Sequence, residues 1–191
     1  LYPNPASVLA FIENHDTDRF LGEGENLDML KQASTLLLTI RRIPQLYYGT
    51  EVMMNGVKSK SDGYVRKDFP GGWADDKENA LTPEGRTRLQ NESYNFYRNL
   101  LNWRKGNDVI AKGSMKQFMV QHGVYAYARQ YKGKTVFVLL NGTDKEVKLP
   151  LKYYAEVLKD KTQGKDVISG KVTALNEELT MAPRQSMVIE L

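Results

Sequence analysis

Three adjacent polar side chains, Asn14, His15 and Asp16, are the first residues whose types and spacing could do chemistry. They follow directly on the apolar residues 8–12, and such a nearly continuous hydrophobic run is typical of a parallel strand buried on both faces. Parallel strands carry catalytic groups at their carboxyl ends. The pattern therefore puts the three side chains where an active site is expected. The alternative is a junction at which the Asn and the Asp only turn the chain.

A helix and a second strand are predicted to follow and to position this junction. Asn26 is suited to cap a helix over residues 27–41, in which apolar residues recur at helical spacing. Pro44 ends the helix because it forces the preceding residue out of helical geometry. Residues 45–49 form a short apolar segment, so we expect two parallel strands joined by a right-handed helical crossover.

The long segment of residues 50–79 leaves the carboxyl end of the second predicted strand and emerges on the same side as Asp16. Segments of this length without regular structure are usually functional in compact domains. The segment carries Asp62 and Arg66, four residues apart. A further amphipathic helix is predicted over residues 82–105.

Near Gly113 the hydrophobic pattern changes from helical spacing to alternation, which predicts a domain boundary between residues 1–112 and 113–191. Turn residues separate short apolar segments in the second part, as in an antiparallel β-sandwich of about 80 residues. The expected fold class is therefore α/β followed by all-β. The predicted strands are 115–120, 124–130, 135–141, 145–149, 154–158, 171–175 and 186–191.

Composition excludes several classes of protein. The 27 basic and 23 acidic residues are interleaved, so the net charge of +4 does not indicate a nucleic-acid-binding surface. No apolar run approaches the roughly 20 residues of a membrane span. The absence of cysteine excludes disulfides and thiol catalysis, and the two histidines, His15 and His122, form no metal signature. The chain begins with Leu1 and shows no signal peptide, so we expect a segment of a longer protein.

Three motifs in this order make the chain resemble glycoside hydrolase family 13, the alpha-amylase family, and most closely its neopullulanase and cyclomaltodextrinase-like members. FIENHD at residues 11–16 resembles the conserved region at the end of barrel strand seven, and IPQLYYGTE at residues 43–51 resembles the region around strand eight. DGYVRKDFPGGW at residues 62–73 resembles the loop after strand eight in a subgroup. Arg42 departs from the family, which usually has Gly before Ile-Pro.

The resemblance implies the last two strands of a TIM (β/α)8 barrel with their helices, followed by the family's C-terminal β-sandwich. It implies that Asp16 is a third acidic residue, which binds the sugar at the cleavage point and supports the oxocarbenium-like transition state. His15 donates a hydrogen bond to a sugar hydroxyl, and Asn14 orients the pair or only caps the turn. The family's nucleophile and general acid belong to strands four and five, which this sequence does not contain.

Asp62 and Arg66 match an Asp-x-x-x-Arg pair that binds a sugar in related enzymes, because an Arg fork and a carboxylate together grip vicinal hydroxyls. The alternative is an exposed ion pair that holds the loop. The aromatic residues Tyr64, Phe69 and Trp73 could stack on sugars or pin the loop to the barrel. Arg19 is expected to brace the loop after strand seven.

The function expected from the resemblance is the C-terminal part of a retaining α-glucan hydrolase that acts on starch, pullulan or cyclodextrin oligosaccharides and is inactive as this segment alone. The alternative is a non-catalytic carbohydrate-binding or structural module, with Tyr125, Tyr127 and Tyr131 or Tyr153 and Tyr154 as its binding surface. Expected partners are an α-glucan, the missing part of the barrel, and a second copy through the exposed strands. No cofactor is expected in this segment, calcium is possible in the longer protein, and a periplasmic or secreted location fits the family.

Overall fold

The computed structural model describes residues 3–191, and the chain divides into two compact units. The first unit combines Leu1–Leu37 with Arg42–Arg98, and the second combines Leu38–Arg41 with Asn99–Leu191. Two helices, α1 (Leu27–Thr39) and α3 (Arg88–Arg104), have residues in both units. Because the units follow packing and cut through helices, the predicted domain boundary at residue 113 stays a prediction.

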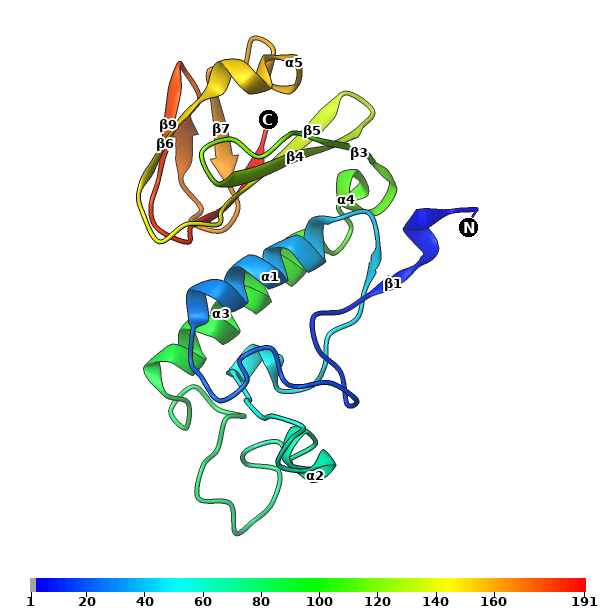
Figure 1. Ribbon diagram of the computed structural model, residues 1–191, viewed down its shortest axis with the longest axis vertical. Coiled ribbons are helices and arrows are strands. Elements are labelled where there is room, and N and C mark those ends of the chain that lie inside the picture. Colours follow the sequence, from blue (N-terminus) through cyan, green and yellow to red (C-terminus); the bar gives the residue numbers. More distant parts are fainter. Residues whose placement is uncertain (1–2) are drawn as a thin grey trace. The chain divides into compact units, whose positions relative to one another are not determined.

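The first unit contains a pair of short parallel strands and the irregular segments that follow them (Figure 1). Strand β1 (Leu9–Ala10) pairs with β2 (Ile43–Pro44), and the intervening helix is α1. The predicted strand–helix–strand unit with parallel strands is therefore confirmed. The remaining elements of this unit are η1 (Pro5–Ser7), η2 (Thr50–Val52) and α2 (Asp62–Val65).

The first strand is shorter than expected, and the predicted second strand at residues 45–49 is wrong, because the strand that pairs with β1 lies just before it, at Ile43–Pro44. Leu9 and Ile43 are 58% and 47% exposed, so the prediction of a strand buried on both faces is wrong for the described chain. The physical reason is that, within the described residues, β1 belongs to a sheet of two strands in which β2 is its only partner. Gly49, with φ of 81°, already belongs to the turn that leads into η2.

Helix α1 begins where the sequence predicts, because the Asn26 side chain accepts a hydrogen bond from the Met29 backbone N–H at 3.0 Å. Its buried face packs against α3. In the first unit the Ser34 hydroxyl is hydrogen-bonded to the buried Tyr97 hydroxyl, and in the second Arg104 donates to the Leu38 carbonyl at 2.9 Å. Helix α3 begins later than predicted, since residues 82–87 form turns before it.

The second unit contains two antiparallel sheets. The larger has the strand order β3-β4-β5-β10-β7-β8, and the smaller pairs β6 with β9. The strands are β3 (Ser114–Gln117), β4 (Val124–Tyr131), β5 (Lys134–Asn141), β6 (Val147–Pro150), β7 (Gln163–Asp166), β8 (Val172–Ala174), β9 (Glu178–Met181) and β10 (Ser186–Glu190). The helices of this unit are α4 (Asp108–Lys112), η3 (Leu151–Tyr154) and α5 (Ala155–Leu158).

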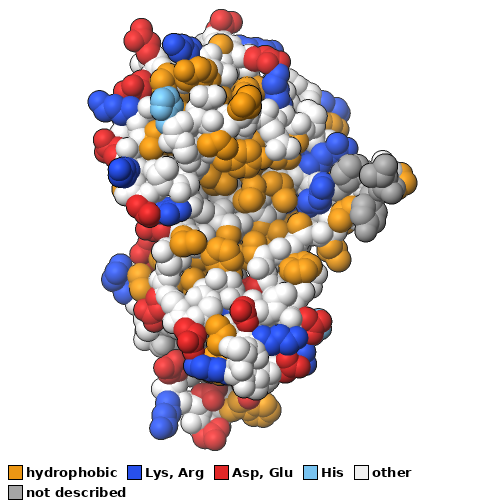
Figure 2. Space-filling model, in the orientation of Figure 1, with side chains coloured by type: hydrophobic (Ala, Val, Ile, Leu, Met, Phe, Trp, Pro, Cys, Tyr) orange, Lys and Arg blue, Asp and Glu red, His pale blue; other side chains and the backbone are white. Residues whose placement is uncertain are grey.

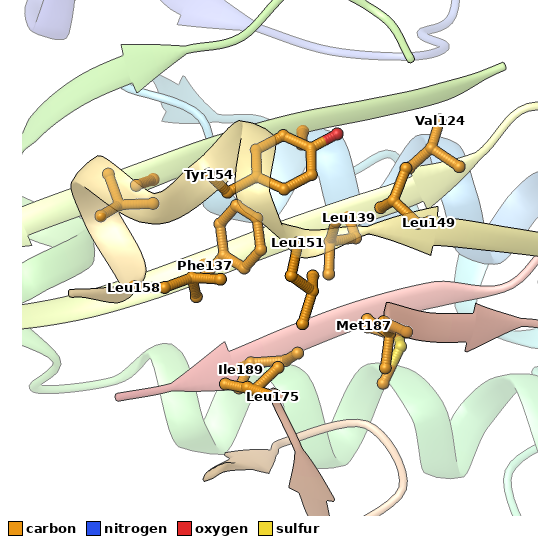
Figure 3. Packing of buried hydrophobic residues seen from close by; sticks show 14 of the residues in the cluster. Val124, Phe137, Leu139, Leu149, Leu151, Tyr154, Leu158, Leu175, Met187 and Ile189 are labelled. Carbon is orange, nitrogen blue, oxygen red and sulfur yellow. The ribbon is translucent and has the colours of Figure 1, made fainter. Parts of the chain in front are cut away.

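The core of the second unit lies between the two sheets and is closed by α5 (Figure 3). Phe137 and Tyr154 are fully buried, with ring centroids 5.2 Å apart, and Phe118 completes an aromatic cluster against both. Aliphatic side chains from β4, β6, β9 and β10 fill the remaining space. The predicted antiparallel β-sandwich is therefore present.

Two predicted features of the sandwich are wrong. Residues 154–158 are helical, because Tyr154, Val157 and Leu158 bury side chains three and four positions apart, which is helical spacing. Strands β7 and β9 were not predicted, and in β7 the buried positions are Gly164 and Asp166, which carry no hydrophobic signal. A side chain at Gly164 would lie 2.3 Å from Ile189 of the neighbouring strand β10, so close strand packing requires glycine there.

No helix within the described residues is long and apolar enough to cross a membrane. On the face shown in Figure 2, Lys and Arg side chains alternate with Asp and Glu side chains. This mixture agrees with the interleaved charges of the sequence.

Candidate functional site

The loop after β1 presents Asn14, His15 and Asp16 in a fixed local conformation. The Asn14 carboxamide oxygen accepts a hydrogen bond from the Asp16 backbone N–H at 2.8 Å, and the Thr17 hydroxyl accepts one from the Asn14 N–H at 3.1 Å. His15 Nε2 lies 3.2 Å from Asp16 Oδ2, and both side chains are 60% exposed. Asn14 thus orients the backbone that carries the imidazole and the carboxylate, and both groups remain open to a ligand.

A buried ion pair holds the two ends of this loop. Glu13 and Arg19 are almost completely buried, with Arg19 Nη1 3.5 Å from Glu13 Oε1. The Glu13 carboxylate also accepts hydrogen bonds from the Phe20 backbone N–H at 2.5 Å and from the Thr50 hydroxyl. Because residues 13 and 19 flank Asp16, the pair fixes both ends of the segment that carries it.

Arg19 also ties this segment to two later parts of the chain. Its guanidinium donates to the Tyr48 carbonyl at 2.6 Å and to the Val65 carbonyl at 3.1 Å, and it lies 4.0 Å from the centroid of the Tyr47 ring. The Arg19 backbone N–H donates to the Gly56 carbonyl at 2.9 Å. These contacts agree with the bracing role expected for Arg19.

Arg66 brings the loop of residues 50–79 onto the Asp16 segment. Its Nε donates to the His15 carbonyl at 2.9 Å, and its Nη2 donates to Asp16 Oδ1 at 3.1 Å. The same Nη2 lies 3.7 Å from Asp62 Oδ2, one helical turn earlier in α2. The structure therefore brings together all five residues proposed for the site, which we call the Asp16 cluster: Asn14, His15, Asp16, Asp62 and Arg66.

Lys58 is a member of this surface that the sequence patterns did not single out. Its Nζ donates to the Asp16 carbonyl at 3.1 Å and lies 3.6 Å from Asp62 Oδ1, while its backbone N–H donates to Asp18 Oδ1 at 2.5 Å. A signal was present, since Lys58, Asp62 and Arg66 repeat at intervals of four with alternating charge. The Asp16 cluster thus combines carboxylates and cationic donors on an exposed surface, a set of groups suited to bind hydroxyls.

No group of three or more His, Cys, Asp or Glu side chains within residues 3–191 is arranged to hold a metal ion. The side chains of the Asp16 cluster are held by ion pairs and hydrogen bonds with one another.

The aromatic residues of the long loop have different environments. Phe69 packs against the small core formed by Val52, Met54 and Ala80, so it anchors the loop. The Tyr64 ring is flanked by two ammonium groups, with Lys60 Nζ 4.6 Å and Lys67 Nζ 4.3 Å from its centroid. Trp73 is 64% exposed and remains open to a ligand.

Among the tyrosines of the alternative binding surface, Tyr127 and Tyr154 are fully buried and cannot bind a ligand. Tyr125 shares a face with Tyr127, with ring centroids 5.4 Å apart, and is half-buried. Burial raises the pKa of Tyr125. Burial and the neighbouring Tyr48 together raise the pKa of Tyr47. Tyr153 is exposed, and so is His122 at the tip of its hairpin.

Comparisons with known proteins find similarity to alpha-amylases and cyclomaltodextrinases. Residues 115–190 match the family model described as the cyclo-malto-dextrinase C-terminal domain. An alpha-amylase of Niallia circulans is 28% identical over 176 residues, which are 88% of this chain and 30% of the relative. A cyclomaltodextrinase of Thermoanaerobacter pseudethanolicus is 32% identical over 136 residues, which are 71% of this chain and 21% of the relative. The chain therefore spans less than a third of these relatives.

Solved structures share the fold over nearly the whole chain. The alpha-amylase of Geobacillus thermoleovorans, determined with acarbose, superposes on 99% of this chain and 40% of its own with a TM-score of 0.76 at 20% identity. The γ-cyclodextrin glucanotransferase (Gamma-CGTASE) of Bacillus clarkii superposes on 100% of this chain and 27% of its own with a TM-score of 0.71 at 23% identity.

Proposed function

Since the chain belongs to the alpha-amylase family of glycoside hydrolases, we propose that it is the C-terminal part of a retaining α-glucan hydrolase acting on α-1,4-glucosidic bonds. The observation that carries the proposal is the Asp16 cluster, in which residues from two loops some 50 positions apart meet on one exposed surface. Starch, pullulan and cyclodextrin oligosaccharides are the proposed substrates. Whether water or a second sugar accepts the glucosyl group depends on parts of the enzyme beyond this chain.

In this proposal Asp16 accepts hydrogen bonds from the hydroxyls of the sugar at the cleavage point. Retaining hydrolysis passes through an oxocarbenium-like transition state between two carboxyl groups about 5–5.5 Å apart. A third carboxylate that binds the distorted sugar more tightly than the relaxed one lowers the barrier, because only interactions stronger in the transition state accelerate the reaction. The Asn14 side chain and Arg66 hold Asp16 in place for this role.

His15 and the loop pair extend the same surface. The His15 imidazole, 3.2 Å from Asp16, donates to a neighbouring sugar hydroxyl. Asp62 and Arg66 bind a further sugar. To bind it, Arg66 replaces part of its contact with Asp16 by hydrogen bonds to the hydroxyls of that sugar. The ion pairs of these exposed groups are worth about 0–1 kcal/mol each, so sugar hydroxyls can replace them at small cost.

The nucleophile and the general acid are proposed to come from strands of the same (β/α)8 barrel outside this chain, with β1 and β2 as its last two strands. The exposed side chains of Leu9, Phe11, Ile43 and Leu46 support this, because barrel strands are normally covered on both faces. A second copy covering the same strands is the alternative. Light scattering on the 191-residue chain tests that alternative, and a monomer at high concentration would count against it.

Hydrolysis of a maltooligosaccharide tests the proposed function. We expect the 191-residue chain to be inactive and a longer protein that includes the preceding barrel to be active. In the longer protein, Asp16→Asn should lower kcat by about 10²–10³-fold, as loss of one transition-state contact does in other hydrolases. Asp28→Asn, in the first turn of α1, is the control and should leave activity unchanged. Hydrolysis by the 191-residue chain that Asp16→Asn abolishes would refute the proposed division of the active site.

A further inference from the structure

A cleft of about 670 Å³ lies entirely within the second unit and shares no residue with the Asp16 cluster. Its size falls in the range of about 300–1,000 Å³ that is usual for small-molecule sites. It is formed by the end of α3, the start of α4, the β4–β5 hairpin and the end of β10. The lining residues that matter for recognition are Trp103, Asn107, Tyr131, Lys134 and Glu190.

Trp103 is held in this cleft by a specific contact. Its indole N–H donates to Glu190 Oε1 at 2.8 Å, and the side chain is only partly buried. The hydrogen bond satisfies the polar group of the indole and limits how the ring can turn. A fixed, partly exposed tryptophan gives a ligand a large apolar surface to stack on at little entropic cost.

Tyr131 provides a second aromatic side chain from a tight hairpin. It pairs with Lys134 across the turn, whose central residues Lys132 and Gly133 have φ of 47° and 78°. Two successive residues with positive φ form the compact turn that suits the twist of a hairpin. Tyr131 therefore stands on a rigid element, with Lys132 Nζ 5.4 Å from its ring centroid.

The cleft is lined by charges of both signs, with Lys105, Lys132 and Lys134 beside Asp108 and Glu190. Asp108 is paired with Lys112 at 2.9 Å, and Glu190 binds the Trp103 indole, so two carboxylates belong to the walls. Lys132 and Lys134 are exposed on the hairpin. Hydroxyl groups can donate to the carboxylates and accept from the ammonium groups, whereas an anion could use only the ammonium groups.

We propose that this cleft is a second glucan-binding site, in which a linear α-glucan stacks on Trp103 and Tyr131 and hydrogen-bonds to Glu190, Asn107 and the hairpin lysines. The choice of an α-linked glucan rests on the proposed function. The site holds substrate without taking part in bond cleavage, because it contains no residue of the Asp16 cluster.

Tryptophan fluorescence of the 191-residue chain tests the site directly. The chain has two tryptophans, so Trp73→Phe leaves Trp103 as the only one. Titration of this variant with maltoheptaose should change its fluorescence in a saturable way, and inorganic phosphate should not. Absence of a response to maltoheptaose, or a saturable response to phosphate alone, would overturn the proposal.

Affinity electrophoresis in gels containing soluble starch identifies the residues. Trp103→Ala and Tyr131→Ala should each weaken binding by about tenfold, as loss of an aromatic contact does, and Trp103→Phe should keep most of the affinity. Met119→Ala, which changes an exposed apolar side chain of the same unit outside the cleft, is the control. Circular dichroism of each variant checks folding. Unchanged binding by both folded alanine variants would refute the site.

Asp16→Asn separates this proposal from the proposed function. The fluorescence response of Trp103 should be the same in Asp16→Asn, because the cleft does not contain Asp16. Loss of the Trp103 response in that variant would overturn the second site. If the longer protein is active but Trp103 gives no response, the second site is refuted and the proposed function stands. If Trp103 responds but the longer protein is inactive, the proposed function is refuted and the second site stands.

Discussion

Two buried charges, Glu13 and Arg19, control the conformation of the segment that carries Asp16. Each side chain has several partners: the Glu13 carboxylate binds the Phe20 N–H and the Thr50 hydroxyl, and Arg19 binds the Tyr48 and Val65 carbonyls. The Arg19 Nη2 atom has no hydrogen-bond partner within residues 3–191. Loss of either charge leaves the other buried and unpaired, which is more costly than loss of an exposed pair.

Arg19→Met should therefore lower the unfolding free energy of the 191-residue chain by about 3–5 kcal/mol, because Glu13 would keep an uncompensated buried charge. Urea denaturation measures the change. The control is Arg66→Met, whose partners Asp16 and Asp62 are exposed, and which should cost no more than about 1 kcal/mol. Equal effects of the two substitutions would show that Arg19 does not brace the loop.

At the scale of elements, Arg129 of β4 joins three segments of the second unit and has no acidic partner among residues 3–191. Its guanidinium donates to the Thr39 carbonyl at the end of α1 at 2.7 Å, to the Ile110 carbonyl of α4 at 2.8 Å, and to the Gly113 carbonyl at 2.9 Å. These carbonyls include helix ends, where a cation is favourable. Burial lowers the pKa of Arg129 to about 10, which still leaves it charged at neutral pH.

We expect Arg129→Met to destabilise the chain by about 3–5 kcal/mol, because several buried carbonyls would lose their donor at once. Thermal unfolding followed by circular dichroism measures the loss. The control is Arg184→Met in the same unit, where Arg184 forms a bidentate pair with the exposed Asp144, with an expected cost below about 1 kcal/mol. A cost below about 1 kcal/mol for Arg129→Met would mean that water replaces the guanidinium at these carbonyls.

At the scale of the whole molecule, both units contain a buried tyrosine that is hydrogen-bonded to α1. Tyr97 in the first unit is hydrogen-bonded to Ser34, and Tyr127 in the second is hydrogen-bonded to Thr39 at 2.5 Å. Burial raises the pKa of both phenols well above the ordinary value of 10.0. The folded chain therefore keeps both phenols protonated at pH values where the unfolded chain ionises them.

The sign of the pH dependence follows from this shift. A raised pKa in the folded state gives stability that is complete below pH 10 and is lost as the pH rises above it, because the unfolded state then releases the proton more easily. Each tyrosine should contribute a slope of about 1.4 kcal/mol per pH unit above pH 10. Tyr127→Phe should reduce the slope of the unfolding free energy against pH by the contribution of one tyrosine. Urea denaturation between pH 9 and 11 measures this slope. Tyr153→Phe, an exposed tyrosine, should leave the slope unchanged, and an unchanged slope in Tyr127→Phe would contradict the burial argument.

The elements that the sequence predicted well have strong local signals. Helix α1 begins at Leu27 after the Asn26 cap, and the hairpin of β4 and β5 matches the alternation of residues 124–141. One error arose where the hydrophobic signal was absent. In β7 the buried positions are Gly164 and Asp166, and their burial depends on contacts with β10 and not on hydrophobicity.

The sequence alone indicated the candidate site residues, since Asn14, His15 and Asp16 follow a predicted strand and Asp62 and Arg66 match a pair in the family that the chain resembles. Only the tertiary structure decided that the two groups meet, because the contact of Arg66 with Asp16 spans 50 residues and depends on how the loop folds back. The same holds for the Arg19 contacts with Tyr48 and Val65 and for the cleft at Trp103, whose walls come from separate elements. Capping, periodicity and charge spacing are local properties of a chain, whereas burial, long-range pairing and cleft formation arise from packing between distant segments.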